Sequence, residues 1–218
     1  MSITENLKSY YNELPKDVTL VAVSKTKPNE DLMEAYEAGQ RIFGENKVQE
    51  MTAKHEELPK DIQWHMIGHL QSNKVKYIVP YVSLIHSVDR LKLFKEIDRQ
   101  AERFRKHVDV LLQVKIADED SKFGMPMAEA KRFFEEDLGK NYPHLTVVGL
   151  MGMATFTDDE TQLKKEFSSL KSLFDTFGES HNLKHLSMGM SGDYELAIAC
   201  GSNMVRVGSA IFGKRNYD

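Results

Sequence analysis

The sequence has little cysteine and proline, no long apolar run and no basic block. A single Cys among 218 residues excludes a disulfide framework and a zinc site built from thiolates, and it favours a reducing compartment. No uninterrupted apolar stretch reaches the roughly 18 residues that a membrane-spanning helix needs. Residues 1–14 are polar and amphipathic, unlike a secretory signal. We therefore expect a cytoplasmic protein with no membrane partner.

Charge excludes a second class of partner. The 29 basic and 33 acidic residues give a net charge of −4, and the basic residues are spread along the chain. Nucleic-acid binding is therefore not expected. His65 and His69 have the i, i+4 spacing of two metal ligands, but on a strand such positions lie about 13 Å apart. No metal site is predicted.

Two periodicities alternate along the chain. Short apolar or β-branched runs, typical of buried strands, recur eight times, at residues 19–24, 41–44, 63–68, 82–87, 108–114, 146–151, 185–190 and 204–208. Helical spacing of apolar residues fills the intervals. The six prolines fall in the connections or at a helix start, so none contradicts this assignment.

Eight alternating units predict an α/β fold, a closed (β/α)8 TIM barrel formed as one domain over residues 1–218. An open doubly wound sheet is the alternative, but its first turn usually carries GxGxxG, and here that turn reads SKTKPNE. An extra N-terminal helix, apolar at Ile3, Leu7, Tyr10, Tyr11 and Leu14, precedes the first strand. We expect it to close the ring of helices in place of a helix after the last strand.

Chemistry in such barrels collects where the strands end. Lys25 follows the first strand and is expected to point into the barrel mouth. Burial there would lower the pKa of its amine and prepare it to form a Schiff base with an aldehyde. The alternative is a solvated loop lysine.

The last two units indicate an anion site. Ser191 follows the seventh strand and is expected to cap a short helix from residue 194, while Gly208 and Ser209 follow the eighth strand. Phosphate is commonly bound at this place in the fold, although each residue alone also suits a plain turn or cap. A lysine opposite a phosphate cradle suggests pyridoxal 5′-phosphate (PLP), with Arg206 near its pyridine nitrogen.

Several long motifs resemble one family. The matching stretches are AVSKTKP (22–28), FGEN (43–46), VQE (48–50), WHMIGHLQSNK (64–74), HSVD (86–89), GLM (149–151), LSMGMSGD (186–193) and VRVGSAIFG (205–213). With them the chain resembles the pyridoxal phosphate homeostasis proteins, which are related to the N-terminal domain of alanine racemases.

The resemblance implies roles for individual residues. Lys25 would form the covalent Schiff base, Asn46 would lie near the cofactor, and Arg206 would face the pyridine nitrogen. Ser191, Gly208 and Ser209 would hold the phosphate. Lys47 and Asn203 depart from the residues usual in the family, and neither falls in the expected Schiff-base or phosphate motifs.

The expected function is a PLP-binding protein that takes part in intracellular vitamin B6 homeostasis, acts as a monomer and passes the cofactor to apo-enzymes. An amino-acid racemase or lyase is the alternative. Racemases of this fold need a second acid/base group from another domain, and only five residues follow Gly213. A guanidinium beside the pyridine nitrogen would also oppose its protonation and weaken carbanion chemistry. A lysine aldolase without a cofactor is a third hypothesis.

Overall fold

The computed structural model describes residues 2–118 and 123–213, and its strands form a closed parallel barrel in sequence order. The strands are β1 (Thr19–Val23), β2 (Ile42–Glu45), β3 (Gln63–Met66), β4 (Leu84–Val88), β5 (Val108–Gln113), β6 (Leu145–Met151), β7 (His185–Met190) and β8 (Met204–Val207). Pairing of β1 with β8 closes the sheet. The predicted TIM barrel is confirmed, and each expected strand is present with shifts of a few residues at its ends.

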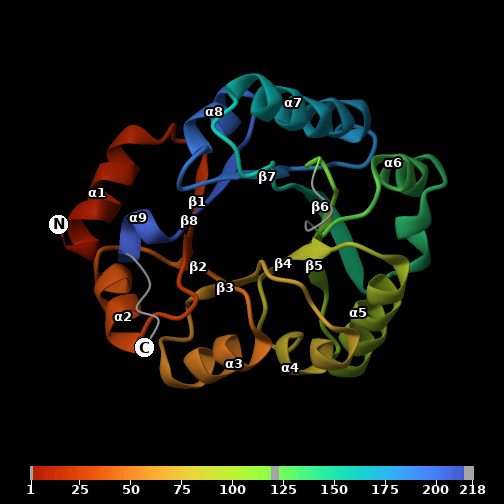
Figure 1. The fold of residues 1–218 in the computed structure, drawn as a ribbon. Helices are drawn as coiled ribbons and strands as arrows, with labels where there is room; N and C mark the ends of the chain where they lie inside the picture. The colour runs from red at the N-terminus through yellow and green to blue at the C-terminus, as the bar shows by residue number, and fades with distance from the viewer. Residues whose placement is uncertain (1, 119–122, 214–218) are drawn as a thin grey trace.

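Helices surround the barrel (Figure 1). They are α1 (Ile3–Glu13), α2 (Asn29–Glu37), α3 (Val48–Glu57), α4 (Val75–Ile78), α5 (Leu91–Phe104), α6 (Met127–Glu135), α7 (Glu160–Phe177), α8 (Tyr194–Ala199) and α9 (Ser209–Phe212), with 3₁₀ turns η1 (Ser72–Lys74) and η2 (Leu138–Asn141). No helix within the described ranges is long and apolar enough to cross a membrane.

The leading helix α1 lies between α8 and α2 (Figure 1), where a full-length helix after β8 would otherwise lie, and the one-turn helix α9 that follows β8 contacts α1. Ser2 caps α1 by accepting from the Glu5 amide, and Glu5 bonds back to Ser2. Tyr10 meets Tyr194 of α8 edge to face, with 5.4 Å between ring centroids. The expected closure of the ring by the N-terminal helix is thus confirmed.

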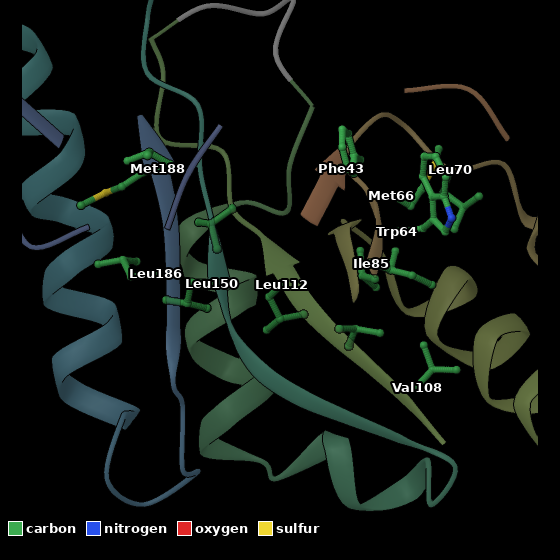
Figure 2. Close-up of a cluster of buried hydrophobic side chains, with 14 of the residues drawn as sticks. Phe43, Trp64, Met66, Leu70, Ile85, Val108, Leu112, Leu150, Leu186 and Met188 are labelled. Carbon is green, nitrogen blue, oxygen red and sulfur yellow. The ribbon is translucent and has the colours of Figure 1, made fainter. Parts of the chain in front are cut away.

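Alternation along the strands divides the core into two parts. Residues facing outward pack beneath the helices, as Figure 2 shows for Trp64, Leu112 and Leu186. A smaller set lies inside the barrel and comprises Val21, Leu84, Leu111, Val148, Met151 and Met204. Because successive strand side chains point to opposite faces, the odd-numbered side chains of β1 turn inward, and Val23 is then the residue that reaches the barrel mouth.

Candidate functional site

A cavity of about 630 Å³ opens at the carboxyl ends of the strands. This volume lies in the range of small-molecule pockets, about 300–1,000 Å³. The cavity is lined by residues from the ends of β1, β2, β7 and β8 and from the loop between β6 and α7. All the residues expected to bind a cofactor line it, namely Lys25, Asn46, Ser191, Arg206, Gly208 and Ser209.

Lys25 lies in the turn that follows β1 and is half-buried. Both of its neighbours are held by side chains of other elements. The Ser24 hydroxyl donates to Oε1 of Glu45 at 2.6 Å, and the Thr26 amide donates to Oε1 of Glu50 at 2.5 Å. Thr26 has a φ of 64°, a left-handed conformation that β-branched residues rarely adopt. The backbone on either side of Lys25 is therefore held in place by contacts with β2 and α3.

One buried ammonium group connects these contacts. Lys54 of α3, 5% exposed, donates from Nζ to Oε1 of Glu45, to Oε1 of Glu50 and to the carbonyl of Ser24, each at 2.8 Å. We call Ser24, Glu45, Glu50 and Lys54 the Lys54 cluster. Burial raises the pKa of the Glu45 carboxyl, and the Lys54 charge and hydrogen bond oppose that rise. The sequence-based analysis missed Lys54 because it lies on a helix rather than at a strand end.

Asn46 follows Glu45 at the end of β2 and is half-buried. Its backbone packs against Gly68 so closely that a Cβ on Gly68 would lie 2.3 Å from the Asn46 carbonyl oxygen. Any larger residue at position 68 would displace Asn46 from the cavity wall. This close approach explains why position 68 holds a glycine.

The expectation that Ser191 caps the helix after β7 is wrong. The structure places Asp193, not Ser191, at the N-cap of α8, and Asp193 makes no side-chain cap hydrogen bond there. The hydroxyl of Ser191 instead accepts from the Gly208 amide at 3.3 Å, which joins the ends of β7 and β8. Gly208 also lies against β1, since a Cβ on it would be 3.2 Å from the carbonyl oxygen of Val23. The helix begins at Tyr194 as expected, but the N-cap is the residue directly before it, and Ser191 lies two residues too early for that position.

Arg206 of β8 points inward and is 4% exposed. Its Nη1 donates to the carbonyl oxygen of Ser187 at 2.9 Å and to the Ser187 hydroxyl at 2.6 Å, and its Nη2 donates to the carbonyl oxygen of Gly152 at 3.1 Å. Burial lowers the pKa of the guanidinium to about 10, and the charge of Asp193 opposes this shift. The group therefore stays cationic at neutral pH beside the cavity.

The structure adds lining residues that the sequence did not single out. Lys27 lines the cavity, and its ammonium donates to the carbonyl oxygen of Phe212 at 2.7 Å. Phe156 lines the rim and is 94% exposed. Both lie in connections between elements, where sequence periodicity gives no signal of direction. Within the described parts of the chain no group of three metal-ligating side chains is present.

Comparison with known proteins decides the family. A family model for the alanine racemase N-terminal domain matches residues 1–216. A pyridoxal phosphate homeostasis protein of Pasteurella multocida is 42% identical over 209 residues, which are 92% of this chain and 88% of the relative. The chain belongs to the family of pyridoxal phosphate homeostasis proteins. A second member of the family, from Vibrio alginolyticus, is 44% identical over 210 residues, which are 93% of this chain and 89% of the relative.

Solved structures agree with this assignment. PipY of Synechococcus elongatus, determined with PLP bound, is 36% identical and superimposes with a TM-score of 0.88 over 97% of this chain and 100% of its own. The same protein without PLP gives a TM-score of 0.91, again over 97% of this chain and 100% of its own. An alanine racemase from E. faecalis, 16% identical, shares the fold with a TM-score of 0.79 over 97% of this chain and 57% of its own. The expected relation to alanine racemases is confirmed.

Proposed function

We propose that this chain binds PLP in the cavity at the barrel mouth and takes part in PLP homeostasis. One observation carries the proposal: the cofactor-binding residues expected from the sequence, which come from separate segments, line one cavity of suitable volume. PLP supplies an aldehyde that reacts with amines. The homeostasis relatives and the PLP-bound PipY structure support the choice of ligand.

The residues present fit such a ligand. Lys25 is the proposed Schiff-base residue, because its half-buried amine lies in the cavity wall. Ser191, Gly208 and Ser209 are the proposed phosphate ligands, and Asn46 is proposed to contact the cofactor. The buried cation of Arg206 would lie near the pyridine nitrogen. Apolar side chains of Val23, Ile67, Met153 and Met190 also line the cavity and suit an aromatic ring.

A carrier role fits better than catalysis. A guanidinium near the pyridine nitrogen opposes its protonation, which weakens the electron sink on which carbanion chemistry depends, although arginine occurs at this place in racemases too. The relatives are named for homeostasis rather than for a reaction. We infer a cytoplasmic, monomeric, single-domain protein over residues 1–218 that holds PLP reversibly and passes it to apo-enzymes. Likeness to alanine racemases supports the fold alone.

The decisive experiment compares two lysines of the same cavity. Lys25→Ala should abolish the visible absorbance of bound PLP and the borohydride-stable adduct detected by mass spectrometry. Lys27→Ala should keep both, because the Lys27 amine already donates to the Phe212 carbonyl. An adduct that survives in Lys25→Ala would refute the assignment. Sustained turnover of a defined amino acid by the wild type, lost in Lys25→Ala, would establish an enzyme instead.

Transfer and assembly need separate measurements. Purified PLP-loaded protein should restore activity to an apo-enzyme added in slight excess, and the Lys25→Ala variant should not. Light scattering should give the mass of one chain with and without PLP. A dimer in either state would contradict the monomer, and activation no faster than by an equal amount of free PLP would contradict direct transfer.

A further inference from the structure

A row of polar side chains crosses the largely apolar barrel interior and ends at Arg206. It consists of His65 on β3, His86 on β4, Ser187 on β7 and Arg206 on β8, each 4% exposed or less. Nε2 of His86 lies 2.9 Å from Nδ1 of His65, and Nδ1 of His86 lies 3.1 Å from the Ser187 hydroxyl. That hydroxyl lies 2.6 Å from Nη1 of Arg206. We call these four residues the Arg206 relay.

Arginine fixes the direction of every hydrogen bond in the relay. A guanidinium has only donors, so the Ser187 hydroxyl accepts from Arg206 and its single hydrogen is left for Nδ1 of His86. A neutral His86 must then carry its proton on Nε2 and donate it to Nδ1 of His65. One arrangement of hydrogens satisfies all three contacts, so the relay is ordered by its charged end.

The imidazoles remain neutral in this arrangement. Burial lowers the pKa of His65 to about 3, and burial together with His65 and Arg206 lowers the pKa of His86 well below its usual value. A second cation beside Arg206 is therefore disfavoured at neutral pH. The neutral side chains of the relay interact with the guanidinium through their dipoles. None of them carries a positive charge that would compete with Arg206 for an anionic ligand.

Only the end of the relay reaches the cavity. Arg206 lines it, whereas His65, His86 and Ser187 are absent from the described lining and lie behind the guanidinium. The carbonyls of Ser187 and Gly152 hold its two terminal nitrogens, and the relay holds the serine hydroxyl. Its more remote members can therefore influence a ligand only through the orientation of Arg206.

We propose that Ser187, His86 and His65 are positioning residues that hold the guanidinium of Arg206 in the orientation that the PLP ring meets. This inference rests on the proposed function. It assigns a role to polar groups that the fold itself does not require, since neighbouring inward positions of the barrel are apolar. The relay sets the cation at the cavity wall before the ligand arrives, which lowers the reorganisation needed on binding.

The first test removes the serine hydroxyl. Ser187→Ala should weaken PLP binding about tenfold, the scale of a hydrogen bond to a charged group, and displace the absorption maximum of bound PLP. Ser202→Ala is the matched control, because Ser202 is also buried, at 4% exposed, but its hydroxyl lies among the carbonyl oxygens of Leu186, Met188 and Met204, with Met188 nearest at 2.7 Å. It should lower the melting temperature while leaving the dissociation constant and the spectrum of bound PLP unchanged.

The second test acts one residue further away. His86→Leu removes the acceptor for Ser187 and should weaken binding about threefold, as expected for a neutral hydrogen bond. His86→Asn offers an amide oxygen in place of Nδ1 and should restore wild-type affinity and spectrum. If His86→Leu does not fold, as judged by circular dichroism, the serine pair still decides the question.

Two results would overturn the positioning role. One is wild-type affinity and spectrum in Ser187→Ala, and the other is an equal loss of affinity in Ser202→Ala, which would mark a general effect of packing. Failure of the proposed function is a different observation, because wild-type protein would then show no PLP spectrum and no adduct on Lys25. All titrations are made at one neutral pH on the full chain.

Discussion

The two sides of the cavity hold their cations by opposite means. On the β1–β2 side, the ammonium of Lys54 is buried against two carboxylates, Glu45 and Glu50, and fixes the turn that carries Lys25. On the β7–β8 side, the described hydrogen bonds of Arg206 end on neutral oxygens. The charge of Lys54 is thus offset by two hydrogen-bonded carboxylates, whereas Arg206 feels the charge of Asp193 without a described hydrogen bond to it and keeps part of its field for the cavity.

Structural support and ligand recognition are therefore assigned to different cations in this barrel. A buried ion pair with additional hydrogen bonds gives fixed geometry, and removing one partner leaves an uncompensated charge. A buried cation among dipoles costs desolvation, as the lowered pKa of Arg206 shows, and keeps its attraction for an anion. The Lys54 cluster therefore fixes the backbone conformation around Lys25. The Arg206 relay fixes the position of the positive charge at the cavity wall.

The largest expected effect comes from breaking the ion pair. Lys54→Met would leave Glu45, fully buried, without its counterion, and we expect the free energy of unfolding to fall by about 3–5 kcal/mol. Urea unfolding followed by circular dichroism measures this. Adding Glu45→Gln to Lys54→Met should recover part of the loss, because the buried charge is then gone. A loss below about 1 kcal/mol in Lys54→Met would show that the buried ion pair contributes little net stability.

The two sides should respond to acid with opposite sign. The pKa values of His65 and His86 in the folded protein lie below the usual value of 6.5 that holds in the unfolded chain. The free energy of unfolding therefore falls as the pH drops below 6.5 toward about 3. Between pH 7 and pH 5 each histidine should cost about 2 kcal/mol of unfolding free energy. Glu45 has a raised pKa in the folded state, so its own contribution to stability rises as pH falls through that value.

Variants separate these contributions. His86→Asn should remove about 2 kcal/mol of the loss between pH 7 and pH 5, whereas Glu45→Gln, made in the wild type, should make the loss steeper. Urea unfolding at both pH values provides the comparison. An unchanged pH dependence in His86→Asn would mean that the imidazole is not kept neutral by burial.

The smallest effect concerns the turn at Lys25. Thr26 has a left-handed backbone, and Thr26→Gly should raise the unfolding free energy by about 0.5–1 kcal/mol, after allowing for the greater freedom of glycine in the unfolded chain. Thr26→Ala is the control, since it keeps the Cβ that clashes and should gain less. Thermal unfolding measures the change. Lower stability in Thr26→Gly would mean that the threonine side chain stabilises the turn, rather than the hydrogen bond from its amide to Glu50.

Periodicity predicted the barrel well and the supporting contacts poorly. Lys25, Asn46 and Arg206 follow or end apolar strands, and the sequence located them because parallel strands bring their carboxyl ends together. Lys54 was missed because helical spacing does not tell which polar residue turns toward the sheet. Ser191 was assigned the wrong bond, since its Gly208 partner is 17 positions away and no local pattern encodes it.

The order of strands and helices and the residues that reach the barrel mouth follow from the sequence alone. These follow from local periodicity and from a fold in which all strands run the same way. Only the tertiary structure decided which charges meet. The packing of α3 sets Lys54 beside Glu45, and closure of β8 on β1 sets Arg206 in the cavity wall, because such contacts depend on distances between segments far apart in the chain.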